Sequence, residues 1–112
     1  MHEYAIAYDL YMTSRKTAIE HKANQVKKVS VDVGTMAMVN PEQVTFLFDM
    51  IKEDDPLFKS TFLECNEVLP QTRCSCGYSG QEIFVCPGCG ALPELVKGRE
   101  IMVTSVELEV DE

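Results

Sequence analysis

The chain has 112 residues, an apolar fraction of 46% and a formal net charge of −8 at pH 7. This length predicts one domain with at most a small additional lobe, and the apolar fraction is sufficient for a hydrophobic core. The acidic balance argues against nucleic-acid binding, and no segment approaches the about 20 apolar residues that a membrane-spanning helix requires.

The first predicted element is a helix from about Glu3 to Lys22, a stretch that contains neither Pro nor Gly. Small and apolar side chains recur along it at the spacing of one helix face, at Tyr4, Ala7, Leu10, Tyr11, Ser14 and Ala18. His21 and Lys22 suit the negative end of a helix dipole, so we expect the helix to end near them.

A strand is predicted next, over residues 26–34. Val29, Val31 and Val33 alternate with polar residues, which is the pattern of a strand that buries one face. Gly34 closes this strand.

A second helix is predicted to begin at Asn40-Pro41-Glu42, which combines a capping Asn, a Pro at the first helical position and an acid in the first turn. It runs to about Lys52, and its apolar face consists of Val44, Leu47, Phe48 and Ile51.

Two more strands follow, separated by a cysteine-rich segment. After a turn at residues 53–56 that we expect to be solvated, residues 60–69 form a strand with Leu63 and Cys65 on one side. Residues 99–110 alternate again, and the side chains expected on one face are Met102, Thr104, Val106, Leu108 and Val110.

This element order predicts an α+β fold in which two helices pack on a small three-stranded sheet. A zinc-ribbon-like lobe with four cysteines is inserted between the second and third strands. We expect a body of residues 1–70 and 98–112, and a zinc-binding lobe of residues 71–97.

The chain has five cysteines, an odd number, and four of them form two short arms. The arms are Cys74-Ser75-Cys76-Gly77 and Cys86-Pro87-Gly88-Cys89-Gly90. We see no signal peptide, because Asp9 interrupts the first apolar stretch and no basic region precedes it. The expected compartment is therefore the cytoplasm, where such thiols are typical of metal ligands rather than disulfides.

We expect the metal on Cys74, Cys76, Cys86 and Cys89 to be a structural zinc ion, since a lobe of this size cannot bury enough apolar surface to fold alone. Iron in a rubredoxin-like site and unligated or redox-active thiols are the alternatives. Cys65 falls where the strand needs an aliphatic residue and is expected in the core, although the short first arm allows it to replace Cys74 as a ligand.

The amino terminus offers a second metal site. The amine of Met1, the following amide nitrogen and the imidazole of His2 can chelate one ion in fused rings, and Glu3 can complete the coordination. In-plane nitrogen donors of this kind favour Ni(II) or Cu(II) over zinc. Taken alone, an exposed His at position 2 is more often incidental, and Glu3 also suits the first turn of a helix.

Together these features resemble the HypA/HybF family of [NiFe]-hydrogenase nickel-incorporation proteins. The resemblance covers Met1-His2-Glu3, the strand ending VDVG, the helix sequence NPEQVTFLFD, the strand sequence LEC and both cysteine arms. It departs from the family in two places. The family's usual first arm is Cys-x-x-Cys, whereas this chain has Cys-x-Cys, and some relatives have a histidine in the zinc lobe, whereas the only histidines of this chain are His2 and His21.

The resemblance implies a nickel metallochaperone and not an enzyme. Ni(II) would bind at Met1, His2 and Glu3 for transfer, and Zn(II) would be structural on the four cysteines. The implied partners are a GTPase of the HypB type and the [NiFe]-hydrogenase large subunit, with urease as an alternative recipient. We expect a monomer or a weak homo-oligomer.

Two other classes of function fit parts of the sequence. The cysteine arms alone would also suit a zinc-ribbon adapter that binds other proteins and has no nickel role. A thiol redox enzyme would need a reactive cysteine, and a complete set of four ligands makes metal binding the better interpretation. Two histidines, His2 and His21, leave no basis for a hydrolase site.

Overall fold

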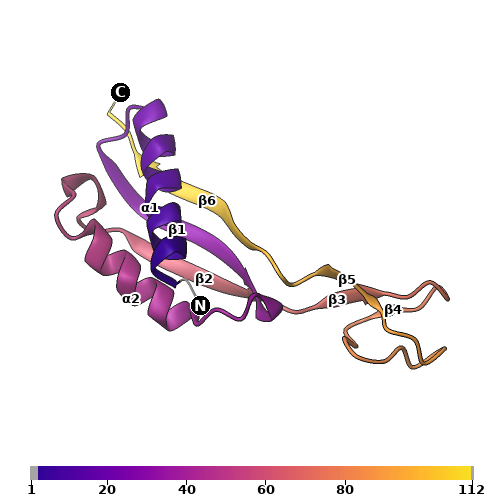
Figure 1. Ribbon diagram of the computed structural model, residues 1–112. Coiled ribbons are helices and arrows are strands. Elements are labelled where there is room, and N and C mark those ends of the chain that lie inside the picture. Colours follow the sequence, from indigo (N-terminus) through magenta and orange to yellow (C-terminus); the bar gives the residue numbers. More distant parts are fainter. Residues whose placement is uncertain (1–2, 112) are drawn as a thin grey trace.

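Two helices lie on one face of a three-stranded sheet, and a narrow lobe extends from one end of that sheet (Figure 1). The structure is a computed structural model and describes residues 3–111. Its principal extents are 57 × 30 × 16 Å, which reflects the projecting lobe. We call the helices with their sheet the body, and residues 71–97 the lobe.

The body contains α1 (Glu3–Glu20), β1 (Gln25–Gly34), α2 (Pro41–Lys52), β2 (Phe62–Val68) and β6 (Ile101–Glu109), with two short 3₁₀ turns, η1 (Thr35–Ala37) and η2 (Pro56–Phe58). The lobe contains β3 (Gln71–Arg73), β4 (Ser79–Gly80) and β5 (Glu94–Lys97). This order confirms the predicted α+β fold with an inserted cysteine lobe. Among the described residues, no helix has the length and apolar character that crossing a membrane requires.

β1 is the central strand of the body sheet, whose order is β2-β1-β6. It runs parallel to β2 and antiparallel to β6. The predicted valine alternation is confirmed, because Val29 and Val31 are fully buried and Val33 is 4% exposed. These side chains form the core together with Ala7, Leu10, Ala18, Val26, Val44, Phe48, Phe58 and Leu63.

The predicted face of β6 is wrong for half of the strand. Ser105 pairs with Ser30 and Val103 pairs with Val31, so Thr104 is an extra residue in a β-bulge. A bulge of one residue reverses the alternation of side chains beyond it. The half-buried apolar residues of β6 are therefore Ile101, Val103, Val106 and Leu108, whereas Met102 is 58% exposed.

α1 ends two residues earlier than predicted, at Glu20. The amide of Lys22 donates to the carbonyl of Ile19, and the amide of Ala23 donates to that of Ala18, while Lys22 has a positive φ of 55°. This is a Schellman motif, which stops a helix by turning one residue into the left-handed region.

The buried face of α1 is confirmed except at its first member. Ala7, Leu10, Ser14 and Ala18 are buried, but Tyr4 is 60% exposed. Its ring stacks on that of Tyr8, with 6.5 Å between ring centroids, and so lies along the outer side of the helix.

The start of α2 is confirmed in detail. The side chain of Asn40 accepts hydrogen bonds from the amides of Glu42, at 2.9 Å, and Gln43, at 3.4 Å, and Pro41 occupies the first helical turn. Val44 and Phe48 are fully buried, and Leu47 and Ile51 pack against the core.

The turn predicted as solvated contains a half-buried carboxylate, that of Asp55. Its Oδ2 accepts a hydrogen bond from the Tyr11 hydroxyl at 2.6 Å and lies 3.3 Å from Nε of Arg15, and its Oδ1 accepts from the amide of Leu57 at 3.0 Å. Sequence could not predict these bonds to α1, because their partners lie 40 or more positions away.

Burial opposes ionisation of Asp55, but the hydrogen bonds from Tyr11, Leu57 and Arg15 outweigh it and lower the pKa of this carboxyl. Conversely, burial and the bond to Asp55 raise the pKa of Tyr11. Asp55 therefore fastens α1 to the connection between α2 and β2.

Two glycines form the junction between the body and the lobe. The amide of Gly34 donates to the carbonyl of Glu100 at 2.9 Å, and the amide of Met36 donates to that of Gly98 at 2.8 Å. A side chain at Gly34 would overlap the carbonyl of Gly98, which itself has a φ of 108°. Only glycine allows these two segments to approach so closely.

We expect Asp55→Asn to lower the free energy of unfolding by about 1–3 kcal/mol near neutral pH, since the Tyr11 hydroxyl and Arg15 lose their anionic acceptor. Because folding lowers the pKa of Asp55, its contribution is present above the carboxyl's unfolded pKa and is lost as the pH falls through the folded pKa, below about pH 4. The difference between wild type and variant should therefore narrow on acidification, which urea unfolding at several pH values measures.

Asp54→Asn is the matched control, because Asp54 is the exposed neighbour of Asp55. We expect it to change stability by less than about 0.5 kcal/mol. Equal losses in the two variants would show that Asp55 does not fasten α1.

Candidate metal centre

The first cysteine arm forms the tight turn between β3 and β4. The amide of Cys74 donates to the carbonyl of Tyr78 at 2.8 Å, and the amide of Gly77 donates to that of Cys74 at 2.9 Å. Gly77 has a φ of 99°, a conformation that residues with a side chain rarely adopt. The short Cys-x-Cys spacing of this arm is therefore accommodated by a turn that closes at Gly77.

The second arm forms a similar turn between β4 and β5. The amide of Gly90 donates to the carbonyl of Cys86 at 2.8 Å, and Gly90 has a φ of 77°. The amide of Gly88 donates to Sγ of Cys86 at 3.3 Å. A glycine with positive φ therefore closes the turn after each cysteine pair, and in the second arm a backbone amide points at sulfur.

The four sulfur atoms of Cys74, Cys76, Cys86 and Cys89 all lie within 4.8 Å of one another. Two pairs of sulfurs join the arms at short distances, 3.3 Å from Cys74 to Cys89 and 3.6 Å from Cys76 to Cys86. Metal–sulfur bonds of about 2.3 Å place the sulfurs of a tetrahedral zinc site about 3.8 Å apart. A tetrahedral ion therefore fits this cluster with only small side-chain shifts.

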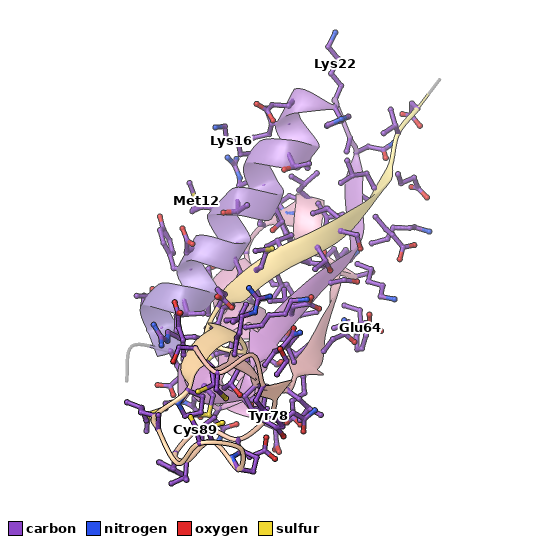
Figure 2. All side chains as sticks on the ribbon, turned by 90° about the vertical axis from the view of Figure 1, so that its right-hand side faces the viewer. Met12, Lys16, Lys22, Glu64, Tyr78 and Cys89 are labelled. Atoms are coloured by element: carbon purple, nitrogen blue, oxygen red, sulfur yellow. The ribbon has the colours of Figure 1, made fainter. Side chains whose placement is uncertain are left out.

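One side of the cluster faces the lobe and the other faces solvent. Cys74 and Cys86 are buried, whereas Cys76 and Cys89 are exposed. In Figure 2 the lobe faces the viewer, and the labelled Cys89 lies beside the gathered sulfur atoms. Such a site can hold an ion without burying it in the body.

Proximity drives the pKa values of two of these thiols apart. Hydrogen bonds from the backbone of Cys76 and from the Cys89 thiol lower the pKa of Cys74 to about 6. The backbone of Ala91 favours the Cys89 thiolate, but the neighbouring sulfurs of Cys74 and Cys76 outweigh it and raise the pKa of Cys89 to about 12. Without a cation, the cluster therefore combines a thiolate with a thiol that keeps its proton.

A small antiparallel sheet with the order β4-β3-β5 supports the arms, and the sequence did not reveal it. Thr72 of β3 is 1% exposed, and its hydroxyl donates to the carbonyls of Gly80 at 3.1 Å and Glu82 at 2.8 Å. The strands of this sheet have only two to four residues, which is too short for an alternation pattern to identify them.

Cys65 lies outside the cluster. It belongs to β2, packs against the core as a half-buried side chain and lies 3.8 Å from the hydroxyl of Thr45. Burial raises the pKa of its thiol. The alternative in which Cys65 replaces Cys74 as a ligand is wrong for this geometry, because Cys74 is in the cluster and Cys65 is not.

Of the predicted nickel ligands, Met1 and His2 lie outside the described residues. Glu3 is the first residue of α1 and is half-buried. Figure 1 shows that α1 begins at the end of the body nearer to the lobe. His21 follows the other end of α1, where its Nδ1 lies 2.9 Å from the carbonyl of Thr17.

Comparison with known proteins gives one family. The family model described as HypA, the hydrogenase/urease nickel incorporation metallochaperone, matches residues 1–108. The hydrogenase maturation factor HypA of Methanocella arvoryzae is 36% identical over 114 residues, covering 98% of this chain and 100% of its own length. That of Aquifex aeolicus is 31% identical over 115 residues, covering 99% of this chain and 100% of its own length.

Solved structures share the fold. The solution structure of the Ni metallochaperone HypA from Helicobacter pylori has a TM-score of 0.76 at 20% identity and covers 99% of this chain and 100% of its own. A second solution structure of a HypA protein has a TM-score of 0.78 at 20% identity, with 99% and 98% covered. The family model and the relatives confirm the family resemblance predicted from the sequence, and the solved structures confirm the fold.

We expect metal binding at the cluster to release protons, because a thiol with a pKa of about 12 must lose its proton to become a ligand. The apparent association constant for Co²⁺ should then fall about tenfold, for each proton released, with every unit by which the pH is lowered. Thiolate-to-cobalt charge-transfer absorbance, titrated at several pH values near neutrality, measures this constant. An affinity that does not change with pH would show that all four sulfurs are already ionised.

Proposed function

Since the chain belongs to the HypA family of nickel-incorporation metallochaperones for hydrogenase maturation, we propose that it binds one Ni(II) ion at its amino terminus and delivers it to [NiFe]-hydrogenase. The proposed nickel ligands are the amine of Met1, the imidazole of His2 and Glu3, and the proposed zinc ligands are Cys74, Cys76, Cys86 and Cys89. The observation that carries this function is the family match over residues 1–108, which includes the first three residues.

The chemistry of the terminus supports nickel over zinc. A terminal amine, an ionisable amide and an imidazole lie in consecutive positions and provide in-plane nitrogen donors, which suit a square-planar ion. Because Glu3 is already part of α1, the chelating segment would be joined directly to a rigid element. Its ligands can be protonated or exchanged one at a time, so nickel can be passed on.

The cysteine cluster supports a structural ion in the same chain. Its four sulfurs have the spacing of a tetrahedral site, and they leave no position for a further ligand. Zinc bound there would cross-link the two arms and neutralise charge on the thiolates. Because the lobe's own strands are so short, this cross-link would contribute much of its stability.

The body and the lobe would then have separate tasks. We assign residues 1–70 and 98–112 to a nickel-binding body and residues 71–97 to a zinc-binding lobe, in a cytoplasmic protein. The family works in hydrogenase maturation and is a metallochaperone family rather than a family of catalytic enzymes. A GTPase of the HypB type and the hydrogenase large subunit are the proposed partners, and urease maturation is the alternative destination.

We expect tag-free protein to bind one Ni(II) per chain, and His2→Ala to weaken this binding at least tenfold, since the imidazole is one of the chelating donors. Isothermal titration of Ni(II) into zinc-loaded protein measures the affinity. The matched control is His21→Ala, which removes an exposed imidazole from the other end of α1.

Equal nickel affinity in wild type and His2→Ala would contradict the terminal site. If both variants bind zinc normally and neither binds nickel differently from wild type, the zinc-ribbon adapter becomes the better interpretation.

We expect purified protein to contain about one zinc per chain, and Cys86→Ser to lose it and unfold the lobe, because one ligand of four is removed. Cys65→Ser is the control, since Cys65 lies on β2 outside the cluster. Metal analysis and near-UV circular dichroism measure the two effects. Unchanged thermal stability after complete zinc removal would contradict a structural role.

A further inference from the structure

The two edges of the body sheet differ in how regularly they pair with β1. β2 pairs with β1 over seven consecutive residues, from Phe62 to Val68, without any shift of register. β6 pairs with two irregularities, one of them the bulge at Thr104. Bulges protect a sheet edge from pairing with another chain, so β2 is the unprotected edge.

The Glu64 side chain of β2 does not obstruct the outer edge of the strand. Glu64 is turned toward β1, where its carboxylate accepts a hydrogen bond from Ser30 at 3.3 Å and pairs with Lys28 at 3.4 Å. Figure 2 shows Glu64 on the side of the sheet that faces away from α1. No strand other than β1 pairs with β2 in the described part of the chain.

A groove of about 490 Å³ lies between this strand and α2. Cys65 from β2 and Thr45 and Phe46 from α2 line it. Phe46 is 59% exposed, so its ring offers an apolar surface to an occupant of the groove. Figure 1 shows α2 running alongside β2, so the groove follows the edge of the sheet.

The groove has acidic side chains and no basic ones among its lining residues. Glu42 and Asp49 line it from α2, and Glu67 projects from β2 on the same side as Cys65 by strand alternation. Glu42 and Asp49 are seven residues apart, about 10 Å along the helix axis. Two lysines four residues apart on a strand are separated by about 13 Å, and their flexible side chains can adjust to the shorter distance between the two carboxylates.

We propose that this groove binds an extended, basic segment of a partner protein, which adds to the body sheet as a strand beside β2. Main-chain hydrogen bonds to the unpaired edge would provide affinity, and every second side chain would enter the groove. An apolar side chain would pack on Phe46, and lysine or arginine side chains on either side would pair with Glu42 and Asp49. The groove shares no residue with the proposed nickel and zinc ligands, so this function goes beyond metal binding.

A synthetic peptide tests the groove directly. The probe is acetyl-Thr-Lys-Thr-Val-Thr-Lys-Thr-amide, titrated into ¹⁵N-labelled, zinc-loaded full-length protein and followed by amide chemical shifts. We expect saturable shifts concentrated in β2 and α2. Two control peptides replace the lysines by glutamates or the central valine by proline, and both should bind at least about fivefold more weakly, through charge repulsion or loss of strand pairing.

Charge-neutralising variants test the recognition on the protein side. Glu42→Gln/Asp49→Asn should weaken binding of the lysine peptide about fivefold at low salt, the effect of two exposed ion pairs. The matched control is Asp9→Asn/Glu20→Gln, which makes the same change in net charge on the exposed side of α1. It should leave the affinity unchanged within about twofold.

Several outcomes would overturn this function of the groove. They are no binding up to about 1 mM peptide, equal binding of the lysine and proline peptides, shifts that map outside β2 and α2, and equal effects of the two double variants. Self-association of the free protein that shifts the same β2 amides would instead identify a second copy of the chain as the occupant.

Discussion

Burial of the valine face of β1 beneath the two helices is the interaction on which the rest of the structure depends. Val29 and Val31 are completely enclosed, and each such side chain contributes roughly 1.5–3 kcal/mol relative to an exposed position. Because β1 pairs on both edges, fixing it also fixes β2 and β6. These two strands lead directly into and out of the lobe, so the position of the metal cluster follows from the order of the body.

The lobe is stabilised by a different principle. Its strands are too short to bury a core, and its buried residues are Thr72, Pro93 and two of the cysteines. Order in the lobe therefore depends on hydrogen bonds, on glycines with positive φ and on the close approach of four sulfurs. This difference explains how one small chain can combine a body that needs no metal with a lobe that would depend on one. At the junction, backbone hydrogen bonds from Gly34 to Glu100 and from Met36 to Gly98 hold the two parts together.

Helices and body strands were predictable because each is determined by side chains close together in the sequence. The cap at Asn40 acts within three residues, and the valine alternation of β1 is a local pattern. The cysteine arms were equally visible, since metal-ligand spacing is a short-range property. Family membership followed from the combination of these local patterns, and the comparisons bear it out. The separate roles given to Met1 and His2 still rest on chemistry, because these residues lie outside the described structure.

By itself, then, the sequence determined the α+β order, the buried face of β1 and the two cysteine arms that meet at the sulfur cluster. Only the tertiary structure decided which sulfurs pair across the two arms, that Cys65 stays in the body, and that Asp55 binds α1 across 40 or more positions. It also placed the bulge at Thr104, where the pairing of β6 with β1 shifts by one residue. The physical reason is common to all of these: each depends on a contact between segments distant in the chain, and no local pattern encodes the partner.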